Sequence, residues 1–259
     1  MKKETECLIL FAMSPLIYTL IASISVSCIS LVGGLILFLS RDIVEKYSIY
    51  LVSFAAGTML AAAFIDLLPE AVKAGEGQPI FLATLLGVVS YFFLERFLLW
   101  YHHHDEMHGA KPTTTLILLG DGLHNFIDGI GIAAAFLTNP ILGLTTTIAI
   151  AAHEIPQEIG DMAVLVHNGM SGKKALWLNF CSGLTALVGA LLGFYFLQSV
   201  ESLVPLFLAF TAGMFIYISC SDLIPEIHGH GEGKRGLAQA FLFALGIAVL
   251  WGILKIVEG

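Results

Sequence analysis

Long apolar runs follow one another along the whole chain, with short polar breaks between them. Eight of these runs approach the roughly 20 residues that a helix needs to cross about 30 Å of hydrocarbon. They centre on residues 14–39, 49–68, 79–100, 113–137, 141–166, 174–198, 203–224 and 236–257. The breaks carry charged residues, glycine or Asn-Pro, which are typical of loops. The pattern predicts an all-α integral membrane protein, with residues 1–259 forming a single polytopic domain of eight transmembrane helices.

The second and seventh apolar runs contain the same sequence pattern. Ala56-Gly57 precedes Asp66-Leu67-Leu68-Pro69-Glu70, and Ala212-Gly213 precedes Asp222-Leu223-Ile224-Pro225-Glu226 at identical spacing. In an eight-helix topology these two runs point in opposite directions. The pattern therefore predicts an inverted repeat that relates helices 1–3 to helices 6–8 around the helix 4/5 pair, an arrangement found in many transporters. The alternative is two ordinary helix ends before a proline, with solvated acids.

Composition narrows the class of protein. Hydrophobic residues make up 57% of the chain and charged residues 12%, and the mean hydropathy is +0.87. These values exclude an ordinary soluble globular domain. The four cysteines are scattered without a C-x-x-C pair, which argues against a disulfide framework and against a thiolate metal cluster.

The basic residues predict the orientation, because Lys and Arg are retained on the cytoplasmic side. If the amino terminus lies outside, the inner loops hold eight basic residues and the outer segments hold four. This distribution favours extracytoplasmic positions for both termini. It also places the His-rich loop of about residues 101–111 in the cytoplasm.

Two of the predicted membrane helices carry side chains that ligate metals. The fourth contains His124-Asn125-Phe126-Ile127-Asp128-Gly129, and the fifth contains His153-Glu154-Ile155-Pro156-Gln157-Glu158. From Pro112 to Gly172 there are five carboxylates and no Lys or Arg. Buried carboxylates need a positive partner. We therefore expect a cation between these helices, whereas a lone polar residue would suggest only a hydrogen bond between helices.

Helical spacing gathers these side chains on two faces. Residues three or four apart share a face, so Asp121, His124, Asn125 and Asp128 form one polar stripe. On the next helix His153 pairs with Gln157, and Glu154 pairs with Glu158. Imidazole, carboxylate and amide ligands suit Zn²⁺, and also Fe²⁺ or Mn²⁺, while the lack of thiolates argues against copper(I).

At these residues the chain resembles the ZIP (Zrt/Irt-like) family of divalent-metal transporters, in the branch whose fourth and fifth helices carry HNF-x-DG and HEIPHE-x-GD. The resemblance covers essentially the whole chain and implies a single transporter domain with both ends outside. Carried over by position, His124, Asp128 and His153 match ligands of the main transport site of the family. Asn125 and Glu154 match an adjacent second metal position.

The chain departs from the family pattern in two places. Gln157 replaces the usual His, which exchanges an imidazole nitrogen for a weaker amide ligand. The sixth helix, at Ser182-Gly183-Leu184, lacks the Glu that some relatives contribute to the second metal. The predicted metal ligands are thus His124, Asn125, Asp128, His153, Glu154 and Gln157.

The resemblance implies zinc uptake toward the cytoplasm by alternating access, with Zn²⁺ as transported substrate and Fe²⁺, Mn²⁺ or Cd²⁺ as other candidates. It implies no enzymatic activity, no catalytic cofactor and no nucleic acid partner. The expected partners are the metal, the lipid bilayer of the plasma membrane and a second copy in a homodimer. One alternative is an intramembrane zinc metalloprotease, because His153 to Gln157 approximates H-E-x-x-H with Glu154 as general base, although its second His is absent. A metal sensor or a channel remains a further alternative.

Overall fold

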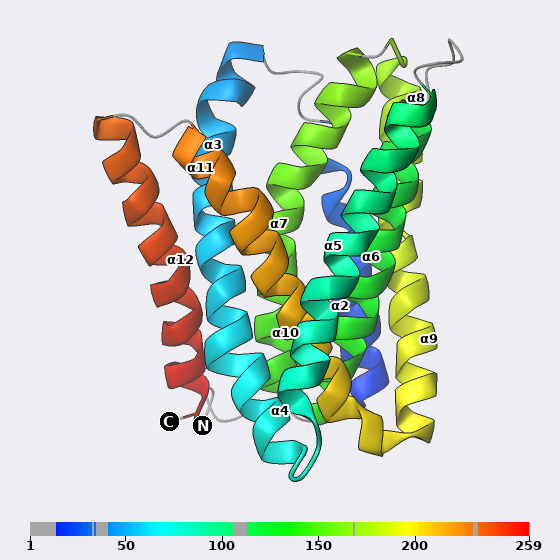
Figure 1. Ribbon diagram of the computed structural model, residues 1–259, viewed down its shortest axis with the longest axis vertical. Coiled ribbons are helices and arrows are strands. Elements are labelled where there is room, and N and C mark those ends of the chain that lie inside the picture. The colour runs from blue at the N-terminus through cyan, green and yellow to red at the C-terminus, as the bar shows by residue number, and fades with distance from the viewer. Residues whose placement is uncertain are drawn as a thin grey trace, which may run out of the picture.

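The structure, a computed structural model, describes residues 14–32, 34, 41–105, 113–167, 169–229 and 233–258, and within these ranges the chain is helical apart from short turns. The helices are α2 (Pro15–Ile29), α3 (Arg41–Ala61), α4 (Leu68–Ala74), α5 (Ile80–Asp105), α6 (Thr113–Thr138), α7 (Pro140–His167), α8 (Gly172–Gly183), α9 (Thr185–Ser199), α10 (Val204–Ile218), α11 (Ile224–Gly229) and α12 (Lys234–Glu258). Together with η2 (Ala62–Leu67), η4 (Glu201–Leu203) and η5 (Ser219–Leu223) they form eight membrane-crossing segments in one bundle (Figure 1). The predicted fold class is confirmed.

Large apolar side chains cover the outside of this bundle, and acids and imidazoles lie within it. Phe81, Leu237 and Ile256 are 74–82% exposed, whereas His153 and Glu154 are buried. This distribution suits a hydrocarbon environment, because water would penalise such an apolar surface. By length and composition, four stretches of the described residues qualify as membrane spans, namely Ile49–Ala74, Gly172–Ser199, Glu201–Gly229 and Arg235–Ile256.

Two crossings differ from the predicted runs. The first helix, α2, ends at Ile29, well before residue 39, and the sequence has two consecutive glycines at positions 33 and 34, which are unfavourable in a helix. The sixth crossing is interrupted at Leu184, between α8 and α9. There the Thr185 hydroxyl donates to the carbonyl oxygen of Ser182 at 2.6 Å. A Ser-Gly pair is a common cause of such a helix break.

The two aspartates of the predicted repeat both lie in π-helices. Asp66 belongs to η2, which joins α3 to α4, and Asp222 belongs to η5, which joins α10 to α11. The two crossings run in opposite directions, with α4 at one end of the bundle and α11 at the other (Figure 1). Single-turn π-helices are rare and frequent at functional sites.

Helices α3 and α12 pack through reciprocal glycines. A Cβ added to Gly57 of α3 would overlap the carbonyl oxygen of Phe243, and one added to Gly246 of α12 would overlap that of Phe54. On each helix the glycine lies three residues after the residue whose carbonyl oxygen meets the glycine of the other helix. Such small residues allow helix backbones to approach closely in membranes.

Helices α5 and α10 repeat this arrangement. A Cβ on Gly213 of α10 would overlap the carbonyl oxygen of Thr84, and a Cβ on Gly87 of α5 would overlap that of Phe210. The three-residue offsets equal those of the first pair. In the repeat, α3 of the second crossing corresponds to α10 of the seventh, and α12 of the eighth corresponds to α5 of the third. The matched glycine contacts therefore show the inverted repeat in the packing as well as in the sequence.

The helices divide into two groups by their contacts. Helices α2, α6, α7, α8 and α9 pack mainly on one another, and we call them the α6–α7 group. Helices α3, α5, α10 and α12, with η2, α4, η5 and α11, form the α3–α10 group. The groups meet chiefly where α3 lies against α7 and α10 lies against α6.

Candidate metal centre

Four of the predicted ligands gather at the contact of α6 with α7. His124 and Asp128 are one helical turn apart on α6, and His153 and Glu154 are adjacent on α7. All four are at least 96% buried. Helix α6 is held close to α9 on its other side, since a Cβ on Gly129 would overlap the carbonyl oxygen of Ala186. The polar stripes predicted from helical spacing therefore do face each other.

The ligand atoms of these four residues surround a common point. The two Nε2 atoms of His124 and His153 are 3.0 Å apart. The Oδ2 atom of Asp128 lies 3.3 Å and 3.2 Å from them, and the Oε1 atom of Glu154 lies 3.6 Å and 3.5 Å from them. Tetrahedral zinc with bonds of about 2.0–2.2 Å separates its ligand atoms by about 3.3–3.6 Å. The five separations, 3.0–3.6 Å, are thus close to or slightly shorter than those of a four-coordinate zinc site.

Both imidazoles direct Nε2 at this point, and the tautomer of His153 leaves its Nε2 unprotonated. The Nδ1 atom of His153 lies 3.1 Å from the carbonyl oxygen of Ala149. A carbonyl only accepts, so Nδ1 carries the proton and Nε2 is the acceptor in the neutral ring. The Nδ1 atom of His124 is hydrogen-bonded to the hydroxyl of Tyr91 on α5, which leaves its Nε2 directed at the same cluster.

The carboxylates at this point have no hydrogen-bond donors. Both oxygens of Asp128 and both oxygens of Glu154 are buried without a hydrogen-bond partner among the described residues. Two imidazoles and two buried carboxylates directed at one another are stabilised when a cation lies between them. Nitrogen and oxygen donors in this number suit Zn²⁺, Fe²⁺ or Mn²⁺.

A second acidic cluster adjoins the first. Ligand atoms of Asp121, Glu154 and Glu158 lie within 4.8 Å of one another, so Glu154 belongs to both clusters. Glu158 accepts hydrogen bonds from Ser30, directly after α2, and from Asn179 of α8. The hydroxyl groups and amides thus replace the basic side chains that this region lacks.

The other two predicted ligands lie beside Asp121. Gln157 donates its amide Nε2 to the Oδ1 atom of Asp121 at 3.0 Å, and Asn125 donates its Nδ2 to the same oxygen at 2.9 Å. Ser182 of α8 also donates to this carboxylate. The Oδ1 atom of Asn125 is buried without a hydrogen-bond partner, so an acceptor remains there. The role of Asn125 and Gln157 as metal ligands stays a prediction.

This arrangement differs from that of an H-E-x-x-H peptidase. In such enzymes both imidazoles come from one helix at i and i+4. Here the second imidazole comes from α6, and Gln157 is engaged with Asp121. The metalloprotease alternative therefore loses its structural basis.

Sequence patterns missed Tyr91, Ser30 and Asn179 as partners of the site. All three lie in predicted apolar runs: Tyr91 in the third, Ser30 in the first and Asn179 in the sixth. A lone polar side chain in an apolar run is a weak signal, because most such residues bond to their own helix. These three instead reach the site from other helices.

The acids of the repeat lie on the segments η2–α4 and η5–α11. Asp66 is 9% exposed and accepts a hydrogen bond from Thr145 of α7, whereas Asp222 and Glu226 are exposed. The His-rich loop falls largely outside the described residues. For positions 101–105 the structure describes only the backbone, as the end of α5.

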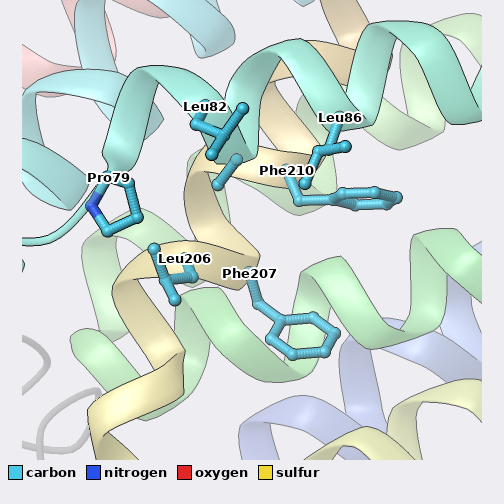
Figure 2. A pocket seen from close by; sticks show the side chains of 7 residues that line it. Pro79, Leu82, Leu86, Leu206, Phe207 and Phe210 are labelled. Atoms are coloured by element: carbon cyan, nitrogen blue, oxygen red, sulfur yellow. The ribbon is translucent and has the colours of Figure 1, made fainter.

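An apolar pocket of about 370 Å³ lies between α5 and α10, away from these clusters. Figure 2 shows that Leu82 and Leu86 of α5 face Phe207 and Phe210 of α10 across it. All of its lining residues are apolar, so it has no side chain that ligates a metal.

Comparison with known proteins agrees with this geometry. A family model described as "ZIP Zinc transporter" matches residues 16–116 and 101–254. "Zinc transporter foi" of Drosophila melanogaster is 38% identical over 154 residues, which are 60% of this chain and 21% of the relative. "Zinc transporter ZIP10" of Homo sapiens is 35% identical over 176 residues, or 61% of this chain and 21% of the relative.

"Zinc transporter ZIP13" of Pongo abelii is 34% identical over 217 residues, which are 77% of this chain and 65% of the relative. The chain thus spans about a fifth of the length of the two other relatives named. The family match covers most of the chain, including both helices of the metal cluster. The chain belongs to the ZIP zinc transporter family, whose members are transporters rather than enzymes.

Proposed function

We propose that this chain transports divalent transition-metal ions across a membrane, with zinc as the main substrate and uptake toward the cytoplasm. The buried four-residue cluster of His124, Asp128, His153 and Glu154 carries the proposal, because two imidazoles and two carboxylates without hydrogen-bond donors in the described part of the chain converge there, as in a site for a dication. Fe²⁺, Mn²⁺ and Cd²⁺ are alternative substrates, since they accept the same donors. The adjacent acidic cluster, with Asn125 and Gln157, is the proposed second cation position.

In this proposal residues 1–259 act as one transport domain. The metal passes Asp66 and Glu70 at the outer mouth, reaches the buried cluster, and leaves past Asp222 and Glu226. The inverted repeat and the division into two helix groups support alternating access, because related halves supply two related end states.

The location and assembly belong to the same proposal. We place the chain in the plasma membrane with both termini outside, and as a homodimer. The start of α2 and the end of α12 lie at the same end of the bundle (Figure 1), which supports a shared side for the termini. The excess of Lys and Arg in the opposite loops supports the outward orientation.

Uptake by the purified protein in sealed liposomes tests this function. Zn²⁺, Fe²⁺, Mn²⁺ and Cd²⁺ are supplied outside, and metal that resists an external chelator is measured over time. We expect saturable zinc uptake that protein-free liposomes lack. Metal that binds to the protein without crossing would favour a sensor and would overturn the transport function, whereas uptake that never saturates would indicate a channel.

Zinc binding should weaken as the pH falls. The imidazole Nε2 atoms of His124 and His153 and the two carboxylates must be deprotonated to bind the metal, so protons compete with zinc. The Kd for zinc, measured by competition with a chromophoric chelator at neutral and at mildly acidic pH, should rise in acid. A Kd that does not change with pH would exclude these imidazoles as ligands.

A further inference from the structure

Tyr91 contacts the metal cluster from outside the helices that form it. Its hydroxyl is hydrogen-bonded to the Nδ1 atom of His124. Its ring meets the imidazole edge-on, with centroids 5.5 Å apart and an interplanar angle of 86°. Tyr91 is itself 91% buried. The contact therefore restricts the rotation of the His124 ring and occupies its Nδ1 atom, which leaves Nε2 for the metal.

In a His that ligates a metal, the direction and basicity of the metal-facing nitrogen depend on the hydrogen-bond partner of the other ring nitrogen. Such outer partners hold the tautomer and the ring orientation, and losing one typically weakens metal affinity by about 10- to 100-fold. His153 has this partner on its own helix, in the carbonyl oxygen of Ala149. For His124 the corresponding partner is Tyr91, which belongs to another helix.

Tyr91 also belongs to the other helix group. It is on α5, which packs on α10 in the α3–α10 group, whereas His124 is in the α6–α7 group. Its own group holds it in place. The ring of Tyr217 on α10 packs against the ring of Tyr91, with 5.6 Å between the ring centroids. The hydrogen bond between Tyr91 and His124 thus crosses the boundary between the groups.

A second hydrogen bond crosses this boundary at a distance from the metal cluster. Thr145 of α7 donates to Asp66 of η2. Thr145 and His153 are eight residues apart on one helix, which corresponds to about 12 Å. A change in how the groups sit against each other would therefore alter both contacts.

Resting on the function proposed above, we propose that Tyr91 is a positioning residue that holds the His124 imidazole for the metal from the neighbouring helix group, so that metal affinity depends on how the two groups sit against each other. When the groups move apart at this point, His124 loses its outer partner and the site binds zinc more weakly. Tight binding in one end state and release in the other then follow from one hydrogen bond.

Tyr91→Phe tests the positioning role, because it removes the hydroxyl and keeps the ring. We expect the Kd for zinc to rise about 10- to 100-fold, and the KM of uptake to rise similarly with little change in maximal rate, as expected when binding rather than turnover is lost. The absorption bands of bound Co²⁺, which report on ligand geometry, should shift. The metal-free melting temperature should stay the same.

Tyr217→Phe is the matched control. It removes the same hydroxyl group from the neighbouring ring and keeps the ring that packs on Tyr91. The Tyr217 hydroxyl donates to Glu95 of α5, within its own helix group, so the Kd for zinc should stay unchanged. A wild-type Kd in Tyr91→Phe, or an equal loss in both variants, would overturn the positioning role. The binding measurements need no transport, so they stand even if the uptake assay fails.

Thr145→Val tests the dependence on the helix groups. It removes the hydrogen bond from Thr145 to Asp66 and should weaken zinc binding when Tyr91 is present. In the Tyr91→Phe protein the loss should be much smaller, because the hydrogen bond between Tyr91 and His124 is already absent. Thr147→Val, which removes a hydroxyl bonded within α7, should leave the Kd unchanged. Effects of Thr145→Val and Tyr91→Phe that simply add would show independent sites and would overturn the dependence on the helix groups.

Discussion

Replacing Asp128 by alanine should reduce zinc uptake to the level of protein-free liposomes. The Oδ2 atom of Asp128 lies 3.3 Å and 3.2 Å from the two imidazole Nε2 atoms, so its loss removes a ligand and half of the carboxylate charge of the cluster. The Kd for zinc should rise by more than the roughly 10- to 100-fold that losing an outer partner causes. Uptake and equilibrium binding are measured on the same purified protein.

Two further variants separate this effect from misfolding. Asp128→Asn keeps the shape of the side chain and should also abolish uptake, because the neutral amide leaves Glu154 alone to balance the charge of the dication in this cluster. Glu76→Ala removes an exposed carboxylate in the turn before α5 and should transport normally. Near-normal uptake by Asp128→Asn would show that the cluster is not the transport site.

Replacing Gly57 or Gly213 by alanine should destabilise the folded bundle by about 1–3 kcal/mol or more. A Cβ at either position would overlap a backbone carbonyl oxygen, of Phe243 and of Thr84 respectively. Backbone atoms cannot rotate away as a side chain can, so the paired helices must separate. We expect a lower melting temperature in detergent for both variants, and similar losses because the two positions are related by the repeat.

Gly252→Ala is the matched control for both substitutions. It makes the same change on α12, where an added Cβ has nothing within 4 Å, and it should be neutral or stabilise the helix by up to about 1 kcal/mol. If Gly57→Ala melts like Gly252→Ala, the close contact of α3 with α12 is wrong. If only one of Gly57→Ala and Gly213→Ala is destabilising, the packing symmetry of the repeat is wrong.

The sequence alone determined the class of fold. Apolar runs report on burial in hydrocarbon, which depends on composition and length rather than on partners, and this is why the eight crossings were predictable. The repeat was visible because Ala56-Gly57 and Ala212-Gly213 keep their distance from the two D-x-x-P-E clusters. The π-helices at Asp66 and Asp222 and the break at Leu184 were not predictable, since each depends on contacts between helices.

For the candidate site, the sequence determined which side chains share a helix face. Spacing along one helix fixes such faces, so the grouping of His124 with Asp128 was predictable. Only the tertiary structure decided which groups meet across helices. The Nε2 atoms of His124 and His153 face each other, Tyr91 is hydrogen-bonded to His124, and Gln157 donates to Asp121. The physical reason is that the rotation and depth of one helix against another follow from packing, at glycines such as Gly129, and no pattern within a single helix encodes them.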